Sequence, residues 1–488
     1  MADALWTTRT DLPLLNSSEV PDRTHDVAVV GAGVTGLTAA LQLARAGKDV
    51  VLLDARHPGA VTTGRTTGKV SALQGTLLSK ALEAAGREPA AAYVDSTLAA
   101  QRWLRQAAGE VGFALESRTA FTYAPTALDE DAARAEREAA RSLGLPVGWK
   151  RNPDLPVPAL AAVTLADQDQ LDPGELVRAL LRACTDAGVT VVCGWRMRHV
   201  HQRRGTVTLT GSRGVPGVRA RAVVLATGAA TVDRRLHFTR LAAQRSYILA
   251  FEVDEEPQAM ALASGGATRS FRGATVDGRP VLLAGGAGHP TGRGRPEPEQ
   301  VDRLRAWVAE HWSGAHEVAA WSAQDYVTPD HLPLVGSLGG ITPDVHLATG
   351  FNKWGLTSGV AAALAITGTL LGARPAWADP LYERGWTGGA LTSLARFQAG
   401  VAMGGAQAAA RLAAPGPTNG TGPLRRGCGS LPVCTHLGGP LRWNAVEQSL
   451  DCPLHGSRFT EDGEVLEGPA TRALPRLPGA AAPARDEP

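Results

Sequence analysis

The sequence predicts an α/β protein of several domains. Its 488 residues are too many for one hydrophobic core, so two to four domains are expected. Residues 25–55 read as a short apolar strand, a glycine-rich turn, a helix and a second strand, the order of a Rossmann-type unit. Residues 221–228 and 345–361 each give a further strand that ends in a glycine turn.

The first of these units, "HDVAVVGAGVTGLTAALQLARAGKDVVLLDA", gives each glycine a mechanical role. Gly31 permits the tight turn, Gly33 lets the backbone approach a pyrophosphate, and Gly36 lets the helix pack closely on the strand. The phosphates then meet free N–H groups at the start of the helix. Asp54 ends the second strand, where a carboxylate accepts hydrogen bonds from a ribose diol. The predicted dinucleotide site comprises Gly31, Gly33, Val34, Thr35, Gly36 and Asp54.

Further segments follow in a specific order. They are "GRTTGKVSALQG" (64–75), "QLDPGELVRALLRACTDAGVTVV" (170–192), "RAVVLATG" (221–228), "DYVTPDHLPLVG" (325–336) and "VHLATGFNKWGLTSGVA" (345–361). With the fingerprint, this series resembles the D-amino-acid-oxidase-like FAD-dependent oxidoreductases over nearly the whole of residues 25–385. The resemblance implies that FAD also contacts Thr66, Thr67, Met197, Ala226, Thr227, Gly228, Gly350, Gly355, Leu356 and Thr357.

The sequence favours noncovalent FAD over a nicotinamide cofactor. The glycine-rich stretch at 282–294 runs into a proline rather than a helix, so no second fingerprint for NAD(P)H is present. No Cys-x4-Cys pair of the disulfide reductases occurs either. Some relatives attach the flavin through a Cys in the last turn or a His after the second strand. Here the matching positions hold Asn352-Lys353 and the stretch 65–69, so no covalent link is expected.

Two insertions, 76–165 and 236–330, separate the FAD-binding segments. In the resembling family such insertions build an antiparallel sheet that covers the flavin and holds the substrate. That family mostly takes hydride from a carbon next to an amine nitrogen, which implies a small amine or amino-acid-like substrate, with CH–OH oxidation as an alternative. The substrate itself is left open. Candidate catalytic residues on this surface are Arg245, Tyr247, His289 and Lys353, each with a structural role as the competing interpretation.

A second candidate site lies near the end of the chain, in "VCTHLGGPLRWNAVEQSLDCPLHGSRF". Its order is Cys434-x-His436, then Cys452-x2-His455. A zinc finger groups Cys with Cys and His with His, whereas this interleaved order suits a two-iron cluster with two thiolates on one iron and two imidazoles on the other. Zinc and a metal-free loop pair remain alternatives. The arrangement resembles a Rieske [2Fe–2S] domain, and the resemblance places Ser457 beside a cluster sulfide.

Two departures from the Rieske pattern qualify this prediction. Positions that carry a disulfide in many Rieske domains hold Gly439 and Leu454. The strands that normally precede the first ligand loop are replaced by a Gly/Pro-rich linker, which also carries Cys428 as an exposed, unpaired thiol. We therefore expect a shortened domain that holds its cluster weakly or with partial occupancy.

Composition limits the partners. A formal net charge of +2 argues against a nucleic-acid or anionic-membrane partner. No signal peptide is recognisable, and the apolar run at 359–372 is too short to span a bilayer, so we expect a buried core helix and a cytoplasmic protein. The expected organisation is an N-terminal extension (1–24), an FAD-binding domain (25–75, 166–235 and 331–413), a substrate domain (76–165 and 236–330), a linker (414–430), a Rieske-like domain (431–476) and a disordered tail (477–488).

Together the motifs predict an FAD-dependent oxidoreductase with a C-terminal electron relay. Flavin accepts two electrons as hydride, and an iron–sulfur cluster passes them singly to an external acceptor. One alternative is a flavin oxidase that uses O2 and carries a vestigial cluster domain. Another is a non-catalytic electron-transfer or redox-sensing flavoprotein.

Overall fold

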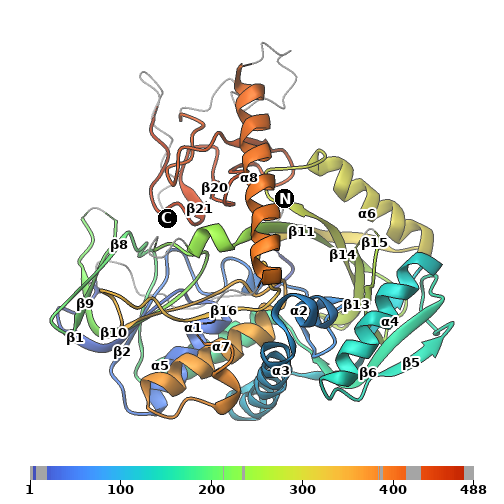
Figure 1. Cartoon of the computed structure of the whole chain (residues 1–488), viewed down its shortest axis with the longest axis horizontal. Helices are drawn as coiled ribbons and strands as arrows, with labels where there is room; N and C mark the ends of the chain where they lie inside the picture. The colour runs from blue at the N-terminus through green and yellow to red at the C-terminus, as the bar shows by residue number, and fades with distance from the viewer. Residues whose placement is uncertain are drawn as a thin grey trace.

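The computed structural model confirms the predicted α/β fold class, with two large sheets and a small C-terminal antiparallel sheet (Figure 1). The predicted disordered tail and the linker, with Cys428, lie outside the described residues, except that the linker's last residue, Ser430, is described. The described residues are 4–6, 19–212, 214–232, 237–266, 268–382, 384, 388–413 and 430–476.

The first sheet is built around the predicted Rossmann-type unit. Its strands β1, β2, β7, β10 and β17 are parallel, β16 pairs antiparallel with β17, and a β8–β9 hairpin extends β10. The strands are β1 (Thr24–Val30), β2 (Val50–Leu53), β7 (Thr190–Val192), β8 (His199–Arg203), β9 (Thr206–Thr210), β10 (Val218–Gly228), β16 (Leu334–Ser337) and β17 (Val345–Thr349).

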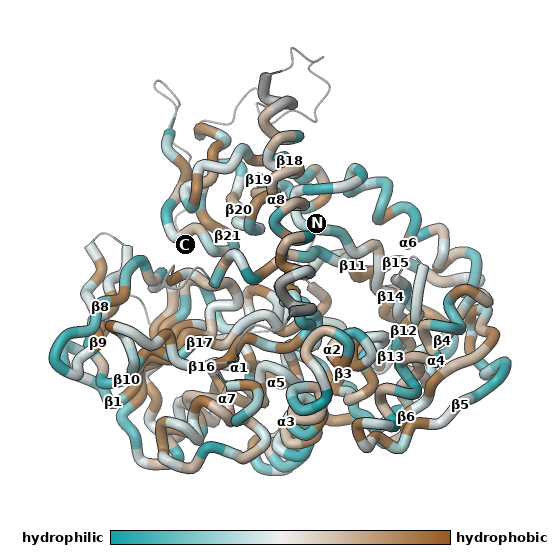
Figure 2. The backbone as a smooth tube through the Cα atoms, in the orientation of Figure 1, coloured by the Kyte–Doolittle hydropathy of each residue, from teal (hydrophilic) through white to brown (hydrophobic). Residues whose placement is uncertain are grey.

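Apolar residues on both faces of these strands explain their near-continuous hydrophobic runs. Val27 and Val29 of β1 pack into one core with the helices, whereas Ala28 and Val30 pack into another with the hairpin strands. Figure 2 shows hydrophobic stretches through this body and hydrophilic ones on its outer loops. The helices on the first face are α1 (Val34–Arg45), α3 (Arg87–Ala107), α5 (Pro173–Asp186) and α7 (Gly355–Leu370). Among the described residues, no helix is both long and apolar enough to cross a bilayer.

The second sheet unites the two insertions. All its strand pairs are antiparallel except β4 with β12, where the first insertion meets the second. Its strands are β3 (Lys69–Val70), β4 (Glu116–Ala124), β5 (Gly148–Arg151), β6 (Ala161–Gln170), β11 (Ala242–Glu252), β12 (Ala259–Ala263), β13 (Arg269–Val276), β14 (Arg279–Pro290) and β15 (His316–Val327). The associated helices are α2 (Leu77–Ala85), α4 (Ala127–Ser142) and α6 (Glu297–His311). Short helical turns are η3 (Thr63–Arg65), η4 (Ala108–Gly112), η5 (His237–Arg240) and η6 (Ala376–Ala378).

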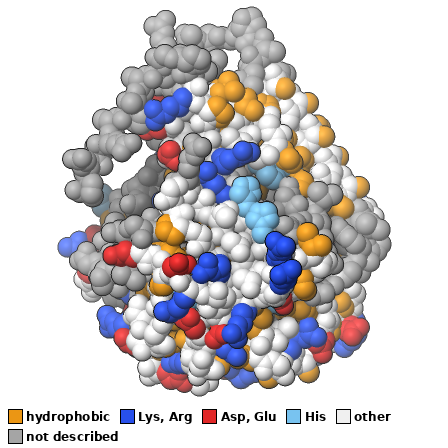
Figure 3. All heavy atoms as spheres, turned by 90° about the vertical axis from the view of Figure 1, so that its left-hand side faces the viewer, with side chains coloured by type: hydrophobic (Ala, Val, Ile, Leu, Met, Phe, Trp, Pro, Cys, Tyr) orange, Lys and Arg blue, Asp and Glu red, His pale blue; other side chains and the backbone are white. Residues whose placement is uncertain are grey.

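The C-terminal unit, residues 430–476, has its own small core around Trp443, Leu450 and Phe459. It sits above the two large sheets, with helix α8 (Gly388–Ala413) standing upright beside it (Figure 1). Acidic and basic side chains are interspersed on the face shown in Figure 3, as a near-neutral net charge leads one to expect. The strands of the unit are β18 (Arg442–Asn444), β19 (Ser449–Asp451), β20 (Arg458–Phe459) and β21 (Val465–Glu467).

Candidate functional site

The glycine turn after β1 places backbone atoms, rather than side chains, at the carboxyl end of the parallel strands of the first sheet. Gly31 has a φ of 107°, and a Cβ on it would collide with the carbonyl oxygen of Ala226 in β10. A Cβ on Gly36 would collide with the carbonyl oxygen of Gly31. Helix α1 begins at Val34, whose N–H donates to the Thr63 hydroxyl at 3.1 Å. Gly33 gives no side-chain cap to the other N–H groups of the first turn, which is where an anion can bind.

Asp54, at the end of β2, braces this turn. Its carboxylate accepts hydrogen bonds from the backbone N–H of Ala32 and of Arg56, each at 2.7 Å. Burial raises the pKa of Asp54, and the two backbone N–H groups oppose that shift. The carboxylate thus holds the glycine turn while facing the space where a ribose diol is expected.

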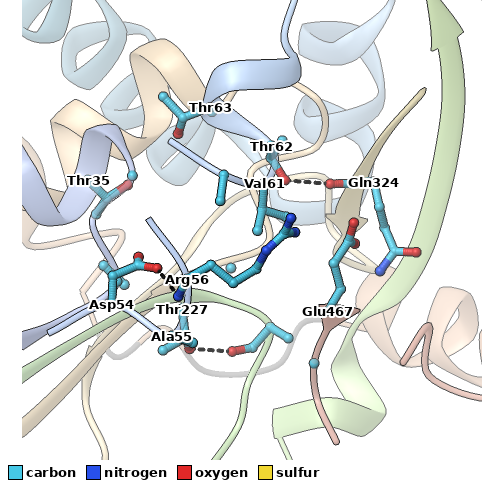
Figure 4. Close-up of a pocket in the computed structure, with 18 of the residues that line it drawn as sticks. Thr35, Asp54, Ala55, Arg56, Val61, Thr62, Thr63, Thr227, Gln324 and Glu467 are labelled. Carbon is cyan, nitrogen blue, oxygen red and sulfur yellow. Dashed lines mark hydrogen bonds between the residues drawn. The ribbon is translucent and has the colours of Figure 1, made fainter. Parts of the chain in front are cut away.

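A cavity of about 1360 Å³, open to solvent, extends from this turn toward the second sheet. Its lining runs from the glycine turn after β1 to Gln324, Asp325 and Tyr326 of β15. Figure 4 shows Thr35, Asp54 and Thr227 on one side of it, with Gln324 and Glu467 across from them. The predicted cofactor residues that line it are Gly31, Gly33, Val34, Thr35, Asp54, Thr66, Met197, Ala226, Thr227, Gly228, Gly355 and Leu356.

The remaining predicted cofactor residues do not line the cavity. Thr67 offers its carbonyl oxygen to the Nε of Arg272. Gly350 turns the chain with a φ of 72°, where a Cβ would lie 2.5 Å from a methyl group of Thr328. The four positions outside the lining are Gly36, Thr67, Gly350 and Thr357.

Lys353 is the predicted catalytic residue that lines the cavity. It and Asn352 both adopt left-handed backbone conformations, with φ of 71° and 53°. The amide of Asn352 donates to the Gly350 carbonyl oxygen at 2.9 Å, which holds the strained turn. The Nζ of Lys353 donates to the Oγ of Ser246 at 2.9 Å, which ties this end of the cavity to β11 of the second sheet.

An acid–base pair stands at this end of the cavity. The backbone N–H of Lys353 donates to the carboxylate of Asp325 at 2.5 Å. Burial raises the pKa of Asp325 to about 6, and burial lowers the pKa of Lys353 while the charge of Asp325 opposes that shift. Both groups therefore titrate nearer neutrality than usual, as groups at functional sites often do.

The other three predicted catalytic residues lie outside the cavity lining, on β11 and β14 of the second sheet. The guanidinium of Arg245 is fully buried, donates to Ser322 at 2.6 Å and Gln324 at 3.0 Å, and lies 3.8 Å from the carboxylate of Asp451. The ring of Tyr247 stacks on that of His289 with centroids 5.8 Å apart. Burial lowers the pKa of His289. Arg245 thus contacts the C-terminal unit, whereas Tyr247 and His289 contact each other within the second sheet, their hydroxyl and Nε2 lying 3.3 Å apart.

Several residues that line the cavity were not predicted from the sequence. Arg56, Arg196, Gln324, Tyr326 and Glu467 all face the cavity. Arg56 follows Asp54 by two positions, a spacing that could have flagged it. The others come from loops and strand ends that meet only in the folded chain, and no local motif marks them.

The two Cys/His loops of the C-terminal unit share one backbone geometry. In each, the cysteine N–H donates to the carbonyl five residues on, and the cysteine carbonyl accepts from the N–H four residues on. These distances are 2.8 and 2.9 Å for Cys434, and 2.8 and 3.1 Å for Cys452. Gly438 and Gly456 close the loops with φ of 72° and 81°. In each loop the Sγ also accepts from the N–H groups two and three residues on.

The loops bring both thiols together and both imidazoles together. The hydrogen bond between the thiols lowers the pKa of Cys434 and raises that of Cys452. The rings of His436 and His455 have centroids 5.3 Å apart at an interplanar angle of 87°, and both rest on the ring of Phe238 in η5. Two adjacent thiols and two adjacent imidazoles are the ligand set that a [2Fe–2S] cluster of Rieske type requires.

At the two positions where many Rieske domains carry a disulfide, Gly439 and Leu454 pack against each other. A Cβ on Gly439 would lie 2.5 Å from the Cδ1 of Leu454, so the leucine occupies the space between the loops. The hydroxyl of Ser457 bonds to the Sγ of Cys434, and its oxygen accepts from the N–H of Ala470 at 3.0 Å. The serine named by the Rieske resemblance thus lies beside a ligand thiol.

The body of the protein braces these loops. Within residues 430–476 the four strands all follow Cys434. The Nε2 of Gln324 donates to the carbonyl oxygen of Gly456 at 2.8 Å, and Gly292 packs directly on Pro453. The second cluster loop is therefore held partly by residues outside the C-terminal unit. The expectation that the shortened unit holds its cluster weakly stays a prediction.

Family models match both parts of the chain. Residues 26–368 match the model described as FAD-dependent oxidoreductase, and residues 430–478 match the Rieske [2Fe-2S] domain. The chain belongs to the FAD-dependent oxidoreductase family. FAD and a [2Fe–2S] cluster are the cofactors of its two parts, so the predicted cofactors and enzyme class are confirmed.

Relatives share this arrangement in whole or in part. YhfW of Bacillus subtilis (strain 168), named as a Rieske 2Fe-2S iron-sulfur protein, is 28% identical over 97% of each chain. A cytochrome b6-f complex iron-sulfur subunit of Synechococcus sp. (strain JA-3-3Ab) is 52% identical over 42 residues, 9% of this chain and 24% of that one.

Solved structures share the fold of the FAD-dependent oxidoreductase part. Glycine oxidase from Geobacillus kaustophilus superposes with a TM-score of 0.63 at 21% identity, covering 75% of this chain and all of that one. L-Proline dehydrogenase from P. horikoshii gives a TM-score of 0.62 at 15% identity, covering 74% and 96%. At such identities the likeness is one of fold.

Proposed function

We propose that this oxidoreductase oxidises the CH–NH bond of a small amine or amino-acid-like molecule and passes the electrons through its own cluster to an external one-electron acceptor. When bound, FAD supplies hydride acceptance and the cluster supplies one-electron transfer. The CH–NH bond becomes C=N as its carbon gives a hydride and its nitrogen releases a proton. The two electrons of the hydride then reduce two equivalents of acceptor, and its proton is released to solvent.

The observation that carries this proposal is a direct contact between the cavity and a cluster loop. Gln324 lines the cavity and donates to the carbonyl oxygen of Gly456, which is next to His455. A vestigial tail has no need of such docking. The contact favours a relay over the two alternatives, an oxidase that bypasses the unit and a redox sensor without a substrate.

Residues at the flavin end of the cavity support an amino-acid-like substrate. Lys353 presents a cationic amine there beside the hydroxyl of Ser246, a pair suited to a substrate carboxylate. Asp325 adds a carboxyl group whose pKa of about 6 suits proton acceptance near neutral pH. Glycine oxidase and L-amino acid deaminase of Proteus myxofaciens, which share the fold, are consistent with this class.

The test is anaerobic turnover of a panel of amines and amino acids, with ferricenium as a one-electron acceptor and O2 as the alternative. Cys452→Ser should lose acceptor reduction while its flavin is still bleached by substrate. Equal ferricenium and O2 rates that survive this substitution would identify an oxidase instead. No bleaching with any substrate would point to a redox sensor.

A further inference from the structure

The FAD cavity has a wall that belongs to the iron–sulfur unit. Leu466, Glu467, Gly468 and Thr471 line the same cavity as the glycine fingerprint, more than 400 positions earlier in the chain. Figure 4 shows the carboxylate of Glu467 facing the guanidinium of Arg56, which comes from the loop after Asp54. This wall therefore closes the cavity at the side that holds the nucleotide part of FAD.

The position of this wall is fixed within the C-terminal unit by buried charges. Glu467 accepts a hydrogen bond from Arg458 at 2.7 Å. The same buried guanidinium donates to Asp451 at 3.2 Å and Glu447 at 3.1 Å. Such a paired and hydrogen-bonded cluster is costly to disrupt, because removing one partner leaves an uncompensated buried charge. The wall is thus tied to the rest of the C-terminal unit by buried ion pairs.

The wall is joined to the body by residues that themselves line the cavity. Arg196 donates to the carbonyl oxygen of Val465 at 2.8 Å, and the hydroxyl of Tyr326 donates to that of Gly468 at 3.0 Å. A Cβ on Gly468 would lie 3.2 Å from side-chain carbons of Ala229 and Thr231. The wall therefore contacts the segments that follow β7 and β10 of the first sheet and also β15 of the second sheet.

A further set of contacts docks the unit at a distance from the cavity. Arg442 of β18 donates to the carbonyl oxygen of Gly294 at 3.2 Å and to the carboxylate of Glu297 in α6 at 3.4 Å. The side chain of Glu297 is only 4% exposed. Neither Arg442 nor Glu297 lines the cavity. Substitution of either residue should therefore weaken docking of the C-terminal unit without removing a residue that lines the cavity.

We propose that the iron–sulfur unit is the closing wall of the FAD site, so that docking of the unit and retention of FAD are thermodynamically linked. FAD contacts both the first sheet and the docked wall, so it binds the docked state more tightly than the undocked one. By linkage, docking strengthens FAD binding by the same factor that FAD strengthens docking. FAD leaves the protein only after the unit has moved away.

The first test measures FAD release from the full-length holoprotein, by the recovery of flavin fluorescence after dilution. Arg442→Ala removes a charge-assisted docking contact that FAD does not touch, and should speed release about tenfold. Arg279→Ala is the matched control, because it removes an exposed ion pair between Arg279, the first residue of β14, and Glu252, the last residue of β11. Its release rate should equal that of the unaltered protein. Glu297→Gln provides a milder variant should Arg442→Ala fold poorly.

The second test is hydrogen exchange with and without added FAD, read by mass spectrometry. Linkage requires that FAD slow exchange in residues 430–464, which do not line the cavity, as well as in 465–471. Unchanged exchange in 430–464, or unaltered release from both docking variants, would overturn the proposal. Neither measurement involves a substrate, so the outcome is independent of the proposed activity.

Discussion

The side-chain amide of Gln324 donates a 2.8 Å hydrogen bond to the backbone carbonyl oxygen of Gly456. Gln324 belongs to β15 of the second sheet and lines the FAD cavity, whereas Gly456 closes the second cluster loop. The same side chain accepts hydrogen bonds from Arg245 at 3.0 Å and Thr291 at 2.8 Å. One residue thus joins the cavity, the second sheet and the iron–sulfur unit.

Gln324→Leu should therefore destabilise the docked unit. The substitution leaves the Gly456 carbonyl oxygen without its hydrogen-bond donor and removes one of the hydrogen bonds of the Arg245 guanidinium, which still donates to Ser322. This should cost about 1–3 kcal/mol of unfolding free energy. Urea unfolding of the holoprotein measures this loss. Gln258→Leu is the control, because the Gln258 amide is exposed and bonds only weakly, at 3.3 Å, to a local carbonyl. Similar midpoints for both variants would contradict this role for Gln324.

Gly33→Val should yield protein without bound FAD. A Cβ at Gly33 would lie 3.0 Å from the Thr63 hydroxyl, and the branched side chain would fill the place of the pyrophosphate. The absorbance of the purified protein near 450 nm relative to 280 nm, roughly the flavin and protein bands, measures the loss. Gly109→Ala is the control, since a Cβ there meets nothing within 4 Å. FAD from unaltered protein should appear in the supernatant after acid precipitation, because the link is noncovalent; flavin left on the polypeptide would refute that.

NADH and NADPH should not reduce the flavin directly. The chain carries one dinucleotide fingerprint, and the glycine-rich stretch in β14 forms a strand of the second sheet rather than a strand–helix turn. Anaerobic mixing with a large excess of either nucleotide should leave the flavin absorbance unchanged over minutes. A candidate amino-acid substrate that bleaches the flavin serves as the positive control.

Asp325 should give stability a particular pH dependence. Its pKa is raised to about 6 by burial, so its stabilising contribution is complete when it is protonated, below about pH 4. That contribution is lost as the pH rises through about 6. Asp325→Asn, which stays neutral, should gain relative to the unaltered protein over this window in urea unfolding. Asp186→Asn, at the exposed end of α5, is the control and should show no such relative gain.

The glycine fingerprint and the Cys/His loops could be predicted from the sequence, because contacts between residues close in the chain determine their conformations. The fingerprint glycines are set by backbone clashes, such as that of Gly36 with the Gly31 carbonyl, and only glycine avoids them. The Cys/His loops are equally local, because each cysteine bonds to its own loop. These motifs could be recognised without any knowledge of tertiary contacts.

The placement of Arg245 and Glu467 could not be predicted in the same way. Arg245 lies on β11, whose alternate residues face opposite sides of the sheet, and Ser246 points toward Lys353 while Arg245 points toward Asp451. The sequence does not reveal which side the iron–sulfur unit covers. Glu467 reaches the FAD cavity only because of that docking. Inter-domain contacts of this kind leave no periodic pattern along the chain.

Cys452→Ser should remove the cluster while leaving FAD in place. Cys452 is 2% exposed, lies beside the Cys434 thiol, and supplies one of the two thiolates that one iron requires. Serine offers a hydroxyl of far lower acidity, so iron content should fall from at most about two per chain toward zero, with loss of the EPR signal of the dithionite-reduced protein. Cys184→Ser is the control, because Cys184 is buried in the first core and its thiol donates to the Leu37 carbonyl oxygen at 3.4 Å. Iron near two per chain in the unaltered protein would mean that bracing by Gln324 and Phe238 compensates for the short scaffold. A substoichiometric value would mean that the loops hold the cluster weakly despite those contacts, and retention of iron by Cys452→Ser would refute the ligand assignment.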